Sequence, residues 1–128
     1  MRPADLTLQL LDQGQPATLR VQGRSMWPTL AVGDEVRVEQ RSTYAVGDLV
    51  AFDDGRESLV VHRLIAERAG QVRTRGDYMF QADPWISKAD IRGAVRGISR
   101  RKISRLLHLL RLNNPLRKLT FWIRERRH

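Results

Sequence analysis

Residues 23–38, GRSMWPTLAVGDEVRV, place a serine ahead of a Trp-Pro step, a Gly-Asp turn and an alternating strand. The same Gly-Asp pair occurs twice more, at Gly47-Asp48 and Gly76-Asp77. In such pairs the glycine supplies a positive φ and the aspartate accepts hydrogen bonds from nearby backbone N–H groups. The pairs therefore predict tight turns that separate short strands.

The segments between these turns predict a mainly β protein. Their apolar and polar residues alternate in six runs: ATLRVQG, DEVRVEQ, DLVAFDD, SLVVHRLIAE, QVRTRG and IRGAVRGI. Short strands at close spacing, bounded by turn residues, are typical of a coiled antiparallel sheet or barrel.

The N-terminal residues 3–15, PADLTLQLLDQGQ, are ambiguous. Leu6, Leu10 and Leu11 fit one face of a short helix that Gly14 would end. Leucines at positions 6, 8 and 10 also alternate as in a strand. We favour the short helix.

The net charge of +9 is unevenly distributed along the 128 residues. Residues 1–98 hold 13 Lys and Arg against 13 Asp and Glu, whereas residues 99–128 hold ten against one. We therefore expect a β domain over 1–98 and a basic tail over 99–128. The chain has no cysteine, which excludes a disulfide framework, a thiolate metal site and a cysteine nucleophile.

The basic tail contains two amphipathic segments separated by Asn-Asn-Pro, which predict two helices in series or a helical hairpin. Their apolar residues are Ile103, Leu106, Leu107 and Leu110, then Leu116, Leu119, Trp122 and Ile123. Three interpretations remain open: packing on the β domain, binding to an anionic membrane surface, and contact with nucleic acid. The last has the least support, because no nucleic-acid-binding motif accompanies the charge.

Ser25 and His62 are the candidate nucleophile and base. A serine hydroxyl becomes a good nucleophile only when a base takes its proton. His62 lies in the middle of an apolar strand, an unusual place for an ionisable side chain unless the strand faces a cleft. From the residues alone, Ser25 as a turn cap and His62 as a buried histidine remain the simpler interpretation.

Five segments in order, SMWPTL, GDEV, GDLVAF, VVHRL and RGDYMFQADP, resemble the conserved boxes of the signal peptidase I superfamily, which includes the self-cleaving SOS repressors. The resemblance covers roughly residues 17–98, with boxes at 23–38, 47–52, 60–64 and 75–84. It implies the coiled β fold of these serine peptidases. His62-Arg63 stands where the typical bacterial enzymes have lysine and arginine, so the chain resembles the archaeal and endoplasmic-reticulum type.

The resemblance assigns roles to particular residues. Ser25 matches the nucleophile and His62 the general base. Asp83 matches the carboxylate that orients the histidine, and we favour it over Asp77, which would support the site from its turn. Arg63 is either a charge at a strand edge or the partner of a site carboxylate.

The serine box shows one departure from the family pattern. Typical signal peptidases have a serine two positions before the nucleophile, where its hydroxyl helps to bind the oxyanion, and this chain has Gly23. Met26 and Pro28 are the remaining site-supporting residues, and Pro28 would keep the serine turn rigid. We expect neither a metal nor a cofactor.

The resemblance implies a serine endopeptidase that cleaves an exposed leader-like or signal-like segment of a protein or peptide, after small residues. The alternatives are an inactive peptide-binding module and a self-cleaving regulator. No apolar run reaches the ~20 residues that span a bilayer, and the N-terminus lacks the pattern of a secretory signal. We therefore expect a cytoplasmic protein, with peripheral binding to the inner membrane face as the second option.

Overall fold

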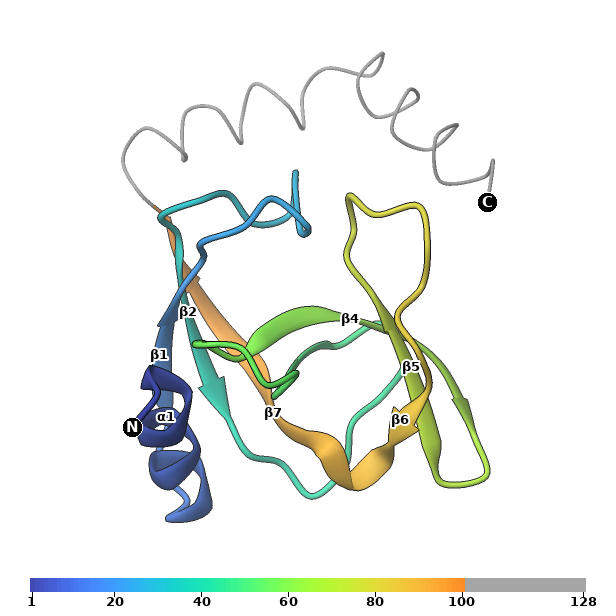
Figure 1. Cartoon of the computed structure of the whole chain (residues 1–128), viewed down its shortest axis with the longest axis horizontal. Coiled ribbons are helices and arrows are strands. Elements are labelled where there is room, and N and C mark those ends of the chain that lie inside the picture. Colours follow the sequence, from blue (N-terminus) through green and yellow to red (C-terminus); the bar gives the residue numbers. More distant parts are fainter. Residues whose placement is uncertain (101–128) are drawn as a thin grey trace.

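The computed structural model describes residues 1–100, which form a curled antiparallel sheet preceded by a short helix (Figure 1). The helix, α1, spans Pro3–Asp12. The strands are β1 (Ala17–Arg20), β2 (Glu35–Glu39), β3 (Leu49–Phe52), β4 (Val60–Arg68), β5 (Gln71–Arg75), β6 (Ile86–Ser87) and β7 (Ile91–Ser99). The mainly β fold is confirmed. The predicted tail lies, from position 101 onward, outside the described residues.

The sheet has the order β1-β2-β7-β3-β4-β5-β6, and every neighbouring pair is antiparallel. The long strand β7 pairs with β2 on one side and with β3 on the other. Register shifts interrupt the β2–β7, β3–β7 and β4–β5 pairs, and such irregularities bend strands and increase their twist. The sheet therefore curls into a half-barrel with β1 and β6 on opposite sides (Figure 1).

The first two Gly-Asp turns have the expected geometry. Gly33 and Gly47 have φ values of 90° and 103°. In each turn the aspartate carboxylate accepts, at 2.9 Å, the backbone N–H of the residue three positions before it. Gly76 does not have a positive φ, so the expectation is wrong for the third pair, whose glycine is needed for a steric reason given below.

The N-terminal segment is helical, as expected, but its buried face differs from the expected one. Ala4 and Leu11 are buried and Leu8 packs beside them, a spacing of four and three residues along one helix face. Leu6 and Leu10 are 57% and 42% exposed. The leucines cover a wider part of the helix surface than the part that packs against the sheet. The helix packs through the side that carries the small Ala4.

Two apolar clusters form the core, and the sheet contributes to both. The first packs α1 and the chain after β1 against β1, β2 and β3, and its largest buried members are Leu11, Leu30, Val36 and Val38. The second joins β3, β4, β5 and β7 through Val50, Phe52, Leu64, Val72, Ile91 and Ala94. His62 shares its face of β4 with Leu64, since alternate residues of a strand point to the same side.

Two short elements were not expected from the sequence: β6, which has two residues, and a 3-10 turn at Lys88–Asp90. Neither is long enough to show an alternating pattern. At the other end of the domain, β7 continues to Ser99, one residue past the predicted boundary. Among residues 1–100, no helix is both long and apolar enough to cross a membrane.

Candidate active site

Ser25 lies on a loop between β1 and β2, which we call the serine loop and define as residues 21–34. Two hydrogen bonds close its base: the Val21 N–H donates to the Asp34 carbonyl and the Gly33 N–H to the Val21 carbonyl, both at 2.8 Å. The Ser25 hydroxyl oxygen lies 3.0 Å from Nε2 of His62 on β4. Residues 37 positions apart in the chain are thus within hydrogen-bonding distance.

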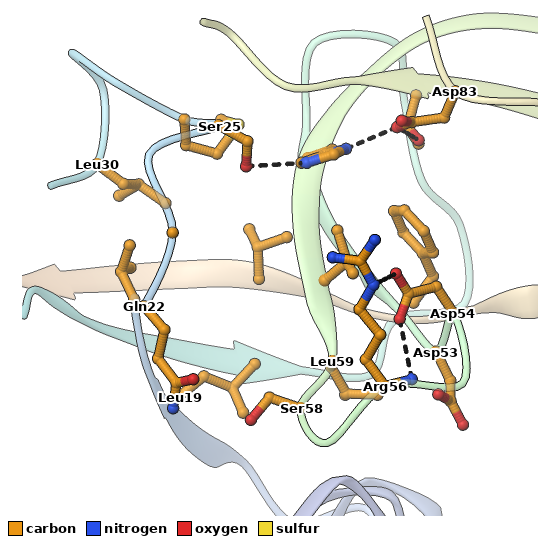
Figure 2. A pocket seen from close by; sticks show the side chains of 18 of the residues that line it. Leu19, Gln22, Ser25, Leu30, Asp53, Asp54, Arg56, Ser58, Leu59 and Asp83 are labelled. Atoms are coloured by element: carbon orange, nitrogen blue, oxygen red, sulfur yellow. Dashed lines mark hydrogen bonds and ion pairs between the residues drawn. The ribbon is translucent and has the colours of Figure 1, made fainter. Parts of the chain in front are cut away.

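His62 lies between Ser25 and Asp83, both of which are labelled in Figure 2. Its Nδ1 is 2.6 Å from Oδ2 of Asp83, and its residue exposure is only 9%. The ring of Phe52 packs against the imidazole with a centroid distance of 5.9 Å and an interplanar angle of 72°. The imidazole is therefore fixed at both nitrogens and on one side.

Asp83, in the segment between β5 and β6, is itself held by three contacts to β5. Thr74 Oγ1 donates to Asp83 Oδ2 at 2.6 Å. The Asp83 N–H donates to the Thr74 carbonyl at 2.8 Å, and Arg73 Nε donates to the Asp83 carbonyl at 2.9 Å. The position of the Asp83 carboxylate is therefore fixed by contacts with β5, independently of its contact with the imidazole.

The charge of Asp83 determines which imidazole nitrogen carries the proton. Partial burial acts to raise the pKa of Asp83, but hydrogen bonds from His62 and Thr74 outweigh it and hold the pKa below its ordinary value. An ionised carboxylate only accepts hydrogen bonds, so the neutral ring places its proton on Nδ1. Nε2 is then free to accept the proton of the Ser25 hydroxyl.

Asp77 does not contact His62 but joins Arg63 to the serine loop. Arg63 donates from Nε and Nη2 to the two Asp77 oxygens at 2.9 and 2.8 Å, and from Nη1 to the Gly47 carbonyl at 2.9 Å. Thr29 of the serine loop donates its hydroxyl to the same carboxylate. The open question about Arg63 is thereby answered: it pairs with a carboxylate beside the site.

The turn at Gly76 lies directly against the nucleophile. The Tyr78 N–H donates to the Ser25 carbonyl at 2.8 Å, and the Asp77 N–H donates to the sulfur of the buried Met26 at 3.4 Å. A Cβ on Gly76 would lie 2.5 Å from the Ser25 carbonyl oxygen. Glycine is therefore required here for close approach of two backbones, not for a positive φ.

Gly23 and Pro28 complete the set of predicted site residues. Pro28 follows a cis peptide bond within the serine loop. Within residues 1–100, and apart from the two chain neighbours of Gly23, no atom lies within 4 Å of the position that a Cβ on Gly23 would take. The site thus has room for the serine that the family pattern leads one to expect at this position.

A groove of about 790 Å³ runs from Ser25 and His62 toward the loop between β3 and β4. Its apolar lining includes Leu19, Val21, Leu30, Val36, Leu59 and Val61. Figure 2 shows Arg56 and Asp54 at the end away from Ser25, where they form an ion pair at 3.2 Å. A groove of this size and lining is suited to hold a segment of polypeptide against the serine.

The structure brings Ser25, His62 and Asp83 together, and Asp77 contacts both Arg63 and Met26 beside them. Thr74, which the sequence reasoning missed, binds Asp83. Its signal is a polar residue at an inward position of β5, in a row with buried Val72. In the part of the chain that the structure describes, no group of three or more His, Cys, Asp or Glu could hold a metal ion.

Comparison with known protein families gives a match. The family model of Peptidase S24-like proteins matches residues 4–75, a span that includes Ser25, His62 and Thr74 and ends shortly before Asp77 and Asp83. A search of curated proteins found no match.

Proposed function

The chain belongs to the Peptidase S24-like family, whose membership supports a peptidase-like or repressor-like function, and from this premise we propose that it is a serine endopeptidase. Ser25 is the nucleophile, His62 the general base and Asp83 the residue that orients the histidine. The observation that carries the proposal is the continuous contact from Ser25 Oγ to His62 Nε2 at 3.0 Å and from His62 Nδ1 to Asp83 at 2.6 Å. This contact supports the proposal that the chain is of the histidine type.

In the first half of the reaction, Ser25 Oγ attacks the carbonyl carbon of the scissile peptide bond while its proton passes to His62 Nε2. Asp83 stabilises the resulting imidazolium and keeps its orientation. The C–N bond of the tetrahedral intermediate then breaks, and the proton on Nε2 moves to the departing amine. The products of this half are a new N-terminus and an ester on Ser25.

In the second half, His62 takes a proton from water as the water oxygen attacks the ester carbonyl. The C–O bond to Ser25 breaks, and the serine oxygen recovers the proton from Nε2. In both halves the backbone N–H of Ser25 faces the negative oxygen of the intermediate. Removal of one such donor typically lowers turnover by ~10²–10³-fold.

The proposed substrate is an exposed leader-like or signal-like segment of a protein or peptide. The apolar lining of the groove supports this class, because side chains of an extended segment would lose water contact against Leu19, Leu30 and Leu59. Cleavage after small residues, and processing of the signal-peptidase type, are the finer parts of the proposal and follow from the resemblance of the sequence boxes.

The nucleophile can be identified with a fluorophosphonate probe and intact-mass measurement. We expect one adduct on the wild type and none on Ser25→Ala. Ser58→Ala is the matched control, because Ser58 lines the same groove at the end away from Ser25 (Figure 2), and this variant should be labelled at the wild-type rate. Equal labelling of Ser25→Ala, or no labelling of the folded wild type with or without anionic vesicles, would contradict the proposal.

The second candidate is a repressor-like or peptide-binding protein without peptidase turnover, and Gly23 is the observation that favours it. The substitution Gly23→Ser separates the two candidates because space for the side chain already exists. For a peptidase with a weak oxyanion site, the added hydroxyl should raise the labelling rate. For a binding module, both forms should remain unlabelled. A self-cleaving regulator would instead lose mass on incubation alone.

A further inference from the structure

Arg100, the residue after β7, makes a contact with the serine loop that the proposed reaction does not use. Its Nη1 donates to the Thr29 carbonyl at 3.1 Å and to Oδ2 of Asp34 at 3.3 Å. These partners are 71 and 66 positions away in the sequence. The Arg100 side chain is 20% exposed and that of Asp34 is completely buried.

The buried Asp34 carboxylate ties together several parts of the serine loop. Its Oδ2 accepts the Ala31 N–H at 2.9 Å, and its backbone carbonyl accepts the Val21 N–H at the base of the loop. A carboxylate removed from water is tolerated only when it is hydrogen-bonded and paired. The Arg100 guanidinium places a positive charge beside this buried carboxylate. Arg100 therefore helps to stabilise the conformation of the serine loop.

Thr29 connects this ion pair to the one beside His62. Its hydroxyl binds Asp77, which Arg63 holds, while its carbonyl binds Arg100. Thr29 is four residues after Ser25 in the same loop. The serine loop is therefore held between two arginines, one on the strand that carries the base and one at the end of β7.

We propose that Arg100 is a positioning residue that fixes Ser25 through Thr29 and Asp34, an inference that rests on the proposed peptidase function. Arg100 does not line the groove, so its loss should leave probe binding intact and slow the chemical step. A displacement of about 1 Å at a reacting group can lower the rate roughly 10²-fold. The site would then require Arg100, the first basic residue of the C-terminal segment.

The test measures the maximal labelling rate and the half-saturating probe concentration separately, on the full chain. We expect Arg100→Ala to lower the maximal rate about 10- to 100-fold, with no change in the half-saturating concentration. Arg100→Lys should recover part of the rate, because an ammonium neutralises Asp34 without the planar fork of arginine. Arg96→Ala is the matched control, since Arg96 also lies on β7 but pairs with Glu39 at the surface.

A double-mutant cycle with Asp34→Asn tests the route through Asp34. If Arg100 acts through this carboxylate, the double variant should lose less than the product of the two single losses. If Arg100→Ala does not fold, Arg100→Lys decides in its place. A reduced maximal rate in a variant that is still folded at the assay temperature supports the inference, whereas a wild-type rate overturns it.

The two proposals fail in different ways. If the folded wild type is not labelled at Ser25, the peptidase proposal itself fails. If the wild type is labelled and folded Arg100→Ala reaches the same maximal rate, or only its half-saturating concentration rises, the peptidase proposal stands and the role of Arg100 is refuted.

Discussion

The serine loop and the β3–β4 loop, residues 53–59, border the same groove but are held in different ways. Buried Asp34 and the nearly buried Asp77 connect the serine loop to β4 and to the end of β7. The β3–β4 loop is held by the start of α1 and by the residue before it: Arg2 binds both oxygens of Asp53 at 3.1 and 2.9 Å, and the Ala4 N–H donates to the Glu57 carbonyl.

The difference between the two loops lies in how much water reaches their carboxylates, since the side chains of Asp34 and Asp77 are 0% and 13% exposed. Arg2 and Asp53 have side-chain exposures of 32% and 26%, and exposed pairs of this kind are screened and contribute little. A buried carboxylate that loses its partner leaves an uncompensated charge, which is far more damaging. We therefore expect the position of the serine loop to be sensitive to the loss of an ion pair, and the position of the β3–β4 loop to be less sensitive.

The largest effect is expected at the carboxylate that orients His62. Asp83→Asn should lower the labelling rate by up to about 10⁴-fold, the loss known for the equivalent change in a Ser–His–Asp triad. The amide would favour the wrong imidazole tautomer. Asp54→Asn, a change of the same chemistry at the far end of the groove, should alter the rate little. Similar rates for the two variants would contradict the contrast between the two regions.

The same aspartate gives a prediction for stability against pH. Because the pKa of folded Asp83 lies below its ordinary value, its charge stabilises the fold above that ordinary value, and this stabilisation disappears as the pH falls through the folded-state pKa. The difference in unfolding free energy between wild type and Asp83→Asn should therefore shrink below about pH 4. Urea unfolding at pH 7 and at pH 3 measures it, and a constant difference would refute the assignment.

An intermediate effect is expected where the serine loop meets the Gly76 turn. Gly76→Ala forces a Cβ against the Ser25 carbonyl oxygen, and such overpacking typically costs about 1–3 kcal/mol of stability. The displaced serine should also slow labelling, by roughly 10²-fold for a shift near 1 Å. Gly97→Ala on β7 is the control, because in the described part of the chain no atom other than those of its chain neighbours lies within 4 Å of the added Cβ. Labelling of Gly76→Ala at the wild-type rate would show that the contact between Gly76 and the Ser25 carbonyl does not fix the position of the serine.

The smallest effect is expected at the β3–β4 loop. Arg2→Ala removes the ion pair to Asp53 and should raise the half-saturating probe concentration less than about fivefold, with the maximal rate unchanged. The two loops would be shown to have different roles if Arg2→Ala changes only the half-saturating probe concentration and Arg100→Ala changes only the maximal labelling rate. A large loss of maximal rate in Arg2→Ala would mean that both loops control the chemistry.

Local patterns in the sequence predicted much of the fold and the three residues that meet in the site. Alternation located six strands, and the ordered boxes indicated Ser25, His62 and Asp83. The contacts between distant segments were not predictable, because they depend on how the sheet curls. The hydrogen bonds of Thr74 to Asp83 and of Arg100 to the serine loop are examples, and each of these two residues is ordinary in its local sequence.

The role of Gly76 and the buried face of α1 were predicted wrongly, because in each case the same sequence pattern fits two different structures. Gly76 resembles the turn glycines at 33 and 47 in sequence, yet its role is to let two backbones approach. The leucines of α1 form a broad stripe, and only the packing of the domain determines which side of it is buried.

The central claim is that His62 activates Ser25, and the most direct measurement compares fluorophosphonate labelling of wild type and His62→Ala at the same pH, with folding verified for both. The account predicts an adduct on Ser25 of the wild type and a rate lower by about 10²–10⁴-fold in the variant, the usual contribution of a general base. Equal rates in the two proteins would show that the 3.0 Å contact between Ser25 and His62 is not a catalytic one.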